Sequence, residues 1–296
     1  MKQQQNARIK LSISMAIFGT IGVFSRNIAV SSGELALYRA ILAVGLLLLY
    51  LLVTKQKIDV KSIKKEALLL LLSGMAMGIN WILLFQAYRY TTISAATLSY
   101  YFAPVIVTLI CPILFREKLT VKQMICFLMS TVGLVLITGL GNLEKGSQDL
   151  KGILFGLGAA VFYAAVILLN KFIRNVKDIQ RTFLQMVSAI VILVPYVAVS
   201  GGVTLGGLNM TGWICLLVVG LIHTGITYCL YFSSLKDLKG QEASILSYID
   251  PLVAVLISVV FLGEKMSILQ MIGGMLILGF TLWNEITPKK KQEGEK

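Results

Sequence analysis

Apolar runs of about twenty residues, the length that crosses a bilayer as a helix, recur along the whole chain of 296 residues. The polar connections between the runs are short, so they leave no room for a soluble domain. The sequence therefore predicts an all-α integral membrane protein with ten transmembrane helices. The predicted helices cover residues 9–30, 34–53, 66–88, 93–115, 119–140, 152–169, 182–199, 211–232, 242–262 and 268–283.

The composition agrees with a chain that lies almost entirely in or beside a membrane. Hydrophobic residues make up 57% of the chain, charged residues make up 14%, and the mean hydropathy is +0.83. The four cysteines lie in apolar runs without a CxxC or histidine pairing, which excludes a recognisable disulfide framework or zinc site. There is no phosphate-binding or dinucleotide-binding glycine loop. We expect no enzymatic activity, no cofactor and no metal.

The basic residues predict the orientation of the helices. If the N-terminus lies inside, 21 lysines and arginines fall in inside segments and four fall in outside loops. Segments rich in lysine and arginine are cytoplasmic in membrane proteins. We therefore expect a multi-pass protein of the cell membrane with both termini in the cytoplasm. The net charge of +13 is explained by this distribution, and no nucleic-acid partner is expected.

The second half of the chain repeats the first half at an offset of about 147 residues. The match is clearest between the segments that begin at Ser94 and Gly240. Weaker matches at slightly smaller offsets pair Gly74 with Gly220. Phe18 and Phe162 are paired in the same way. The clearest pairs are Pro104 with Pro251, Glu117 with Glu264, Lys118 with Lys265 and Gln123 with Gln270.

Five predicted helices in each half require that the second half enters the membrane from the opposite side. The predicted units are an N-terminal five-helix repeat, residues 1–148, and an inverted C-terminal repeat, residues 149–296. Inverted repeats are typical of secondary transporters, whose sites lie near the bilayer midplane on interrupted helices at the repeat interface. Pro104 and Pro251 predict such interruptions at corresponding places.

These features resemble the EamA-type branch of the drug/metabolite transporter superfamily. The residues that carry the resemblance are YYFAP and YIDP in the fourth and ninth predicted helices, FREKLT and FLGEKMS after them, and GMAMGINWILLFQAYRYT in the third. The resemblance implies a central cavity lined by the first, third, fourth, sixth, eighth and ninth helices. It also implies transport of amino acids, other metabolites or drugs, most often outward.

Asp250 is the candidate with the most restrictive position. It lies close to mid-depth of the ninth predicted helix, directly before Pro251. A carboxylate at this depth is costly unless it faces the interior, has a partner or is protonated. It is predicted to mark the transport pathway, as a substrate contact or as a proton carrier. The alternative is a structural ion pair with an arginine.

Two arginines also fall within predicted helices. Arg39 lies roughly 8 Å from the outer end of its helix by helical rise, whereas Arg26 is near the outer end of the first helix. Arginine can reach the membrane surface on its apolar stem, and we favour this interpretation for Arg26. For Arg39 a substrate contact and a structural role are equally compatible with the sequence.

His223 is the single histidine and lies near the middle of the eighth predicted helix. A histidine titrates near neutral pH, which suits proton coupling. A cavity contact, or a buried neutral ring bonded to a backbone carbonyl, is the alternative.

Aromatic and amide side chains are predicted at the same depth. Rings with polar tips suit ligands that have both apolar and polar parts, and they attract ammonium groups. Packing is the alternative for each residue taken alone. The predicted substrate contacts of this kind are Asn80, Trp81, Tyr101, Tyr163, Tyr228 and Tyr248, with Tyr100 beside them.

The sequence thus predicts a secondary active transporter that exports small metabolites, above all amino acids, by alternating access. Asp250 would attract the ammonium group and Arg39 the carboxylate. Uptake, or export of a cationic drug or amine, is the alternative within transport; a membrane enzyme or a scaffold is the alternative outside it. The expected partners are a small-molecule substrate and the lipid bilayer, with proton coupling possible and a monomer or homodimer as the assembly.

Overall fold

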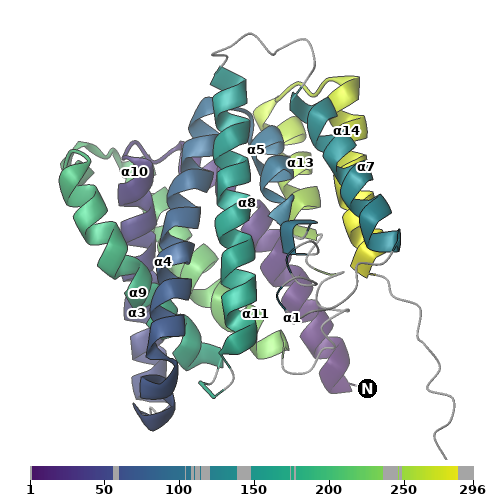
Figure 1. Cartoon of the computed structure of the whole chain (residues 1–296). Coiled ribbons are helices and arrows are strands. Elements are labelled where there is room, and N and C mark those ends of the chain that lie inside the picture. The colour runs from purple at the N-terminus through teal and green to yellow at the C-terminus, as the bar shows by residue number, and fades with distance from the viewer. Residues whose placement is uncertain are drawn as a thin grey trace, which may run out of the picture.

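Helices run side by side through the molecule and are joined by short connections (Figure 1). The computed structural model describes residues 2–55, 60–103, 105–107, 110, 114, 121–138, 148–173, 175–176, 178–235, 246 and 249–285, and these ranges contain no β-strand. The helices are α1 (Lys2–Gly19), α2 (Ile21–Arg26), α3 (Ser32–Val53), α4 (Val60–Tyr90), α5 (Ile93–Tyr100), α7 (Val121–Thr138), α8 (Gln148–Phe172), α9 (Asp178–Val199), the 3-10 turn η1 (Leu205–Gly207), α10 (Met210–Leu217), the π-helix η2 (Val218–Ile226), α11 (Thr227–Leu235), α13 (Ile249–Leu262) and α14 (Ile268–Glu285).

The expected all-helical fold is confirmed for the described residues, and six helical stretches are long and apolar enough to cross a membrane. They are Gln3–Arg26, Ser32–Val53, Ile63–Tyr90, Gln148–Asn170, Ile179–Val199 and Met210–Tyr231. The other four predicted segments coincide with the shorter helices α5, α7, α13 and α14. Parts of the segments 93–115, 119–140 and 242–262 lie outside the described residues, so the count of ten crossings stays a prediction.

Several helices expose an apolar side to the surroundings. Leu49 and Leu52 on α3 are 57% and 65% exposed, and Val121 on α7 and Ile268 on α14 are exposed by more than three quarters. Apolar patches of this extent are rare on soluble monomers. In a bilayer they face lipid, so the described helices have the surface of a membrane protein.

Polar side chains cap several helix starts. Ser31 and Glu34 form a reciprocal capping box at the start of α3, in which each side chain accepts a hydrogen bond from the other residue's backbone N–H. Thr92 caps α5 and Asn209 caps α10 through the backbone N–H groups of Ala95 and Gly212. Each cap satisfies a backbone donor that has no partner inside its helix.

The first helix of each half of the chain packs mainly against helices of the other half. Helix α1 packs against α11 and α13, and α8 packs against α4 and α5. Helix α3 contacts η2, α9 contacts α4, and α3 and α9 also contact each other. Helices α5 and α13 form a further pair, as do α7 and α14.

Two helices are irregular where they approach the middle of the bundle. The first membrane stretch is broken at Thr20, between α1 and α2, where the Thr20 hydroxyl oxygen lies 2.8 Å from the Ile17 carbonyl oxygen. In η2 the hydroxyls of Thr224 and Thr227 donate to carbonyls five residues earlier, those of Val219 and Ile222. π-Helical segments occur frequently at functional sites.

Candidate functional site

Arg39 is buried in the interior and does not extend to the membrane surface. Its side chain on α3 is 3% exposed, and its Nε donates to the Thr224 hydroxyl of η2 at 3.0 Å. The guanidinium carbon lies 4.4 Å from the ring centre of Trp81 and 5.3 Å from that of Phe85. No carboxylate pairs with it in the described part of the chain. A buried cation held by aromatic faces is suited to binding an anionic group of a ligand.

Asp250 lies at the start of α13 and points to α5. Its Oδ2 accepts a hydrogen bond of 2.7 Å from the Tyr101 hydroxyl. Helix α1 comes very close at this point, because a Cβ added at Gly19 would lie 2.6 Å from the Asp250 carbonyl oxygen. Among the described residues no arginine or lysine forms an ion pair with Asp250, so the structural ion pair that was the alternative interpretation is not found there.

Tyrosines surround Asp250 and extend toward Arg39. The ring of Tyr100 lies 5.8 Å from that of Tyr101 and 5.1 Å from that of Tyr163 on α8. Tyr100 and Tyr228, the latter on α11, both pack against the buried cluster that contains Trp81 and Phe85, the residues next to the Arg39 guanidinium. Arg39 and Asp250 therefore border one aromatic cluster.

His223 has partners for both ring nitrogens. Nδ1 lies 3.2 Å from the Val218 carbonyl oxygen, which can only accept, so Nδ1 carries a proton. Nε2 lies 2.7 Å from the Thr20 hydroxyl, at the break between α1 and α2. The side chain is 2% exposed and packs beside the Phe24 ring. This arrangement agrees with the buried ring bonded to a backbone carbonyl.

The Asn80 side chain forms its hydrogen bond to a neighbouring helix instead of to Arg39 or Asp250. The Asn80 amide nitrogen donates to the Ala159 carbonyl at 2.6 Å, so it connects α4 to α8. Tyr248 lies outside the described residues, as does Pro104. The interruptions predicted at Pro104 and before Pro251 therefore stay predictions; Pro251 itself is in the first turn of the described helix α13, where proline is tolerated.

Several members of the cluster were not predicted. Thr224 holds Arg39, Phe85 covers it, and Thr20 bonds His223. Phe85 follows Trp81 by four residues and so shares its helix face, which is a signal that the sequence does contain. The two threonines have no such local signal, since their partners are distant in the sequence.

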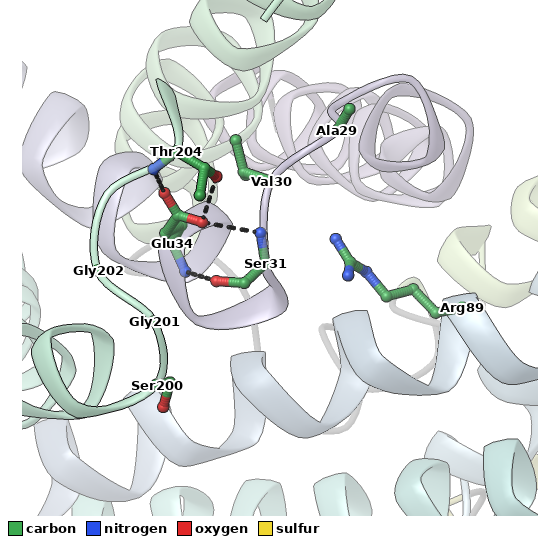
Figure 2. A pocket seen from close by; sticks show the side chains of 9 residues that line it. All are labelled: Ala29, Val30, Ser31, Glu34, Arg89, Ser200, Gly201, Gly202 and Thr204. Atoms are coloured by element: carbon green, nitrogen blue, oxygen red, sulfur yellow. Dashed lines mark hydrogen bonds between the residues drawn. The ribbon is translucent and has the colours of Figure 1, made fainter. Parts of the chain in front are cut away.

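A pocket of about 470 Å³ lies away from this cluster, at the starts of α3 and η1 and the end of α4 (Figure 2). Glu34 forms one wall, and its carboxylate accepts hydrogen bonds from the Thr204 backbone N–H, the Thr204 hydroxyl and the Ser31 N–H. Arg89 points into the pocket from the other side. None of the predicted site residues lines it.

The comparisons with known proteins identify the family. The model of the EamA-like transporter family matches residues 8–139 and 150–284. An uncharacterized transporter, YxxF of Bacillus subtilis, is 35% identical over 93% of this chain and 88% of its own length. An uncharacterized transporter of Archaeoglobus fulgidus is 28% identical, over 92% of this chain and 94% of its own.

A solved crystal structure supports the fold. It covers 93% of this chain and 95% of its own, with a TM-score of 0.66 and 15% sequence identity. The predicted family is thus confirmed by sequence over nearly the whole chain, and both relatives are named as transporters. The chain belongs to the EamA-like transporter family.

Proposed function

We propose that this protein is a secondary active transporter that exports small zwitterionic metabolites, such as amino acids, across the cytoplasmic membrane by alternating access. One observation carries the proposal. The described core holds a cation, Arg39, and an acid, Asp250, without ionic partners among the described residues, and both border the aromatic cluster around Tyr228. A zwitterion would neutralise both groups at once, since its carboxylate pairs with Arg39 and its ammonium group with Asp250.

The packing of the helices supports two inverted five-helix repeats within this proposal. The counterparts in the two halves are α1 and α8, α3 and α9, α4 and the stretch from α10 to α11, α5 and α13, and α7 and α14. If each helix is replaced by its counterpart, the packed pair α1 and α11 becomes α8 and α4, and the pair α1 and α13 becomes α8 and α5, which are also packed pairs. The pair α3 and η2 becomes α9 and α4. The pairs α3 with α9, α5 with α13 and α7 with α14 are converted into themselves. The two separate matches of the family model agree with the same division.

Close-packed glycines support the same division and explain the drift of the repeat. Gly74 and Gly78 on α4 pack against α9, where added Cβ atoms would meet Gln185, Ser188 and Ile192. Gly220 and Gly225 on η2 pack against α3 at Leu42 and Leu46. The first pair is four residues apart and the second five, and the π-helix between Gly220 and Gly225 accommodates the additional residue.

Proton exchange at Asp250 is the coupling that we propose. Burial in the bilayer interior favours the protonated, neutral form of a carboxyl group that has only one hydrogen-bond donor. An arriving ammonium group can take the place of that proton. One proton would then leave the site for each cationic group that enters it. With both termini in the cytoplasm, as the basic residues predict, an inward proton gradient would drive the metabolite outward.

Transport into proteoliposomes tests the proposal. A panel of radiolabelled amino acids and organic cations is offered with and without a pH gradient. Asp250→Asn and Arg39→Gln should each lower amino-acid transport about 100-fold, because each leaves one charge of the ligand buried and unpaired. Asp149→Asn and Arg89→Gln, on the exposed surface, are the matched controls. Amino-acid transport that is unchanged in both core variants would overturn the proposal.

The tyrosines around Asp250 favour one second candidate, export of a cationic amine or drug. Tyr100, Tyr101 and Tyr163 form an aromatic wall next to a carboxylate, which is sufficient to bind an organic cation. For such a substrate Arg39 would be structural. The same panel separates the candidates, because Asp250→Asn would stop cation transport while Arg39→Gln would leave it intact.

A further inference from the structure

Helices α5 and α13 meet along a line of polar side chains. Ser94, Thr97 and Tyr101 follow one another at spacings of three and four residues, so they lie on one face of α5. On α13 the Ser258 hydroxyl is hydrogen-bonded to that of Ser94, and Asp250 accepts from Tyr101. The two contacts are far apart along each helix. They define a seam that leads from the aromatic cluster to the end of the bundle where α4 joins α5.

Thr97 lies between the two contacts on this seam. Its side chain is 3% exposed and lies next to Tyr88 of α4. The Thr97 hydroxyl thus lies within the seam, between the Ser94–Ser258 contact and the Tyr101–Asp250 contact.

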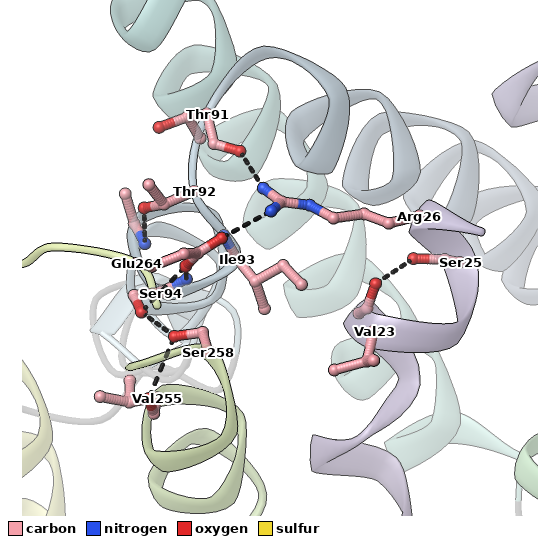
Figure 3. Close-up of polar contacts among 12 residues, drawn as sticks. Val23, Ser25, Arg26, Thr91, Thr92, Ile93, Ser94, Val255, Ser258 and Glu264 are labelled. Carbon is pink, nitrogen blue, oxygen red and sulfur yellow. Dashed lines mark hydrogen bonds and ion pairs between the residues drawn. The ribbon is translucent and has the colours of Figure 1, made fainter. Parts of the chain in front are cut away.

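Glu264 closes the seam at the end of the bundle (Figure 3). One carboxylate oxygen accepts from the Ile93 backbone N–H at 3.0 Å, and the other lies 3.4 Å from the Ser94 N–H. These are the first donors of α5, where a negative charge also interacts favourably with the helix dipole. Arg26 pairs with Glu264 at 2.7 Å and donates to the Thr91 carbonyl at 2.9 Å.

The partners in this cluster belong to two groups of helices. Arg26 ends α2 and Glu264 follows α13, and α13 packs against both α1 and α2. Ile93 and Ser94 begin α5, and Thr91 lies in the connection from α4; α5 packs against α8 as well as against α13. Separation of the two groups would break the hydrogen bonds to the start of α5 and leave the ion pair intact. Glu264 and Arg26 would lose their hydrogen bonds to this segment but would keep each other as ionic partners, which lowers the cost of opening relative to breaking the ion pair.

We propose that the α5–α13 seam is the half of the transport route that leads to the predicted outer face, and that Arg26 and Glu264 form its gate, which is closed in this structure. The inference rests on the proposed transport function. The gate acts on the substrate route and does not itself bind substrate. The passing ligand would exchange hydrogen bonds with the hydroxyls of Ser94, Thr97 and Ser258.

A reporter cysteine below the gate tests this inference without any substrate. In a chain whose four native cysteines are replaced by alanine, Thr97→Cys is exposed in whole cells to a membrane-impermeant maleimide. Glu264→Gln should raise the labelling rate about tenfold, because it removes the charge from the bonds that hold α5. Glu34→Gln is the matched control, since Glu34 also binds backbone donors at this end of the bundle but outside the seam.

Equal labelling in the parent chain, Glu264→Gln and Glu34→Gln would overturn the gate. If Glu264→Gln does not reach the membrane, Glu264→Asp replaces it. This variant keeps the charge on a shorter side chain, and its labelling of Thr97→Cys should also exceed that of the parent chain. A rise in labelling without transport of any panel compound would support the gate and contradict the proposed substrate, so the two failures are distinguishable.

A disulfide across the seam is the second measurement. Ser94→Cys with Ser258→Cys places two thiols where the hydroxyls are now in contact. Oxidation should stop transport of the compound that the unmodified chain carries, and reduction should restore it. A fully cross-linked protein that still transports at the rate of the reduced form would overturn the assignment of the route.

Discussion

The Thr20 hydroxyl lies 2.7 Å from Nε2 of His223, so the break between α1 and α2 is joined to the π-helix η2 by one hydrogen bond. Both residues are in irregular segments, and both segments belong to the core around Arg39 and Asp250. The bond fixes the position of the break relative to the rest of the core.

Removal of this bond should destabilise the protein. Thr20→Val keeps the size of the side chain but leaves Nε2 of the buried His223 without its partner, at a cost of about 1–3 kcal/mol. The midpoint of thermal unfolding in detergent should fall, and Thr20→Ser, which retains the hydroxyl, should restore it. Equal midpoints for the wild type and Thr20→Val would show that the bond contributes nothing to stability.

Tyr101→Phe should weaken transport while leaving the fold intact. The substitution removes the hydrogen bond to Asp250 at 2.7 Å and keeps the aromatic ring. A hydrogen bond to a charged group contributes about 1.5–3 kcal/mol, so the rate at low substrate concentration should fall at least about tenfold. Tyr50→Phe, on the exposed side of α3, is the control. A normal rate in Tyr101→Phe would contradict a role of the pair in transport.

Trp81→Leu should act selectively on substrates that carry a carboxylate. The indole ring lies 4.4 Å from the guanidinium carbon of Arg39, and its loss removes a cation–π contact of about 0.5–2 kcal/mol. The Michaelis constant for amino acids should rise, whereas that for simple amines should stay the same. Trp81→Phe should give an intermediate value. An equal rise for both classes would mean that Trp81 contacts the substrate itself.

Glycine-to-alanine substitutions should report the contacts between the two halves. Gly74→Ala and Gly220→Ala would force a Cβ against Gln185 and Leu42, and such overpacking costs about 1–3 kcal/mol. Gly45→Ala is the control, because nothing lies within 4 Å of its added Cβ and alanine favours the helix by about 0.5–1 kcal/mol. The unfolding midpoint should fall in the first two variants and rise slightly in the third.

The architecture could be predicted from the sequence because it depends on local composition. The predicted helix 34–53 corresponds to α3, Ser32–Val53, and the predicted helix 182–199 corresponds to α9, Asp178–Val199. Apolar runs of this length report a bilayer directly, whatever their neighbours are. The same runs place Asp250 near mid-depth of a helix, whereas they leave open whether Arg39 faces the interior.

The partners of the polar residues could not be predicted. Arg39 and Thr224 are separated by 185 residues, and Thr20 and His223 by 203. No local pattern encodes which helices will be neighbours. Arg26 was expected to reach the membrane surface; its side chain is 35% exposed, and the structure adds an ionic partner, Glu264, that the sequence did not reveal. Glu264 was expected to have a structural role, and its bonds to the start of α5 are compatible with that role.

The π-helical geometry of η2 affects which changes in the number of residues this membrane helix can accommodate. One residue inserted into a regular α-helix rotates everything after it by about 100°, which would turn lipid-facing side chains inward. A π-helix takes up the additional residue locally, so α11 keeps its orientation toward α1. We therefore expect that deletion of one residue between Val218 and Ile226, which would return η2 to a regular α-helix, leaves the lipid-facing sides of α10 and α11 where they are.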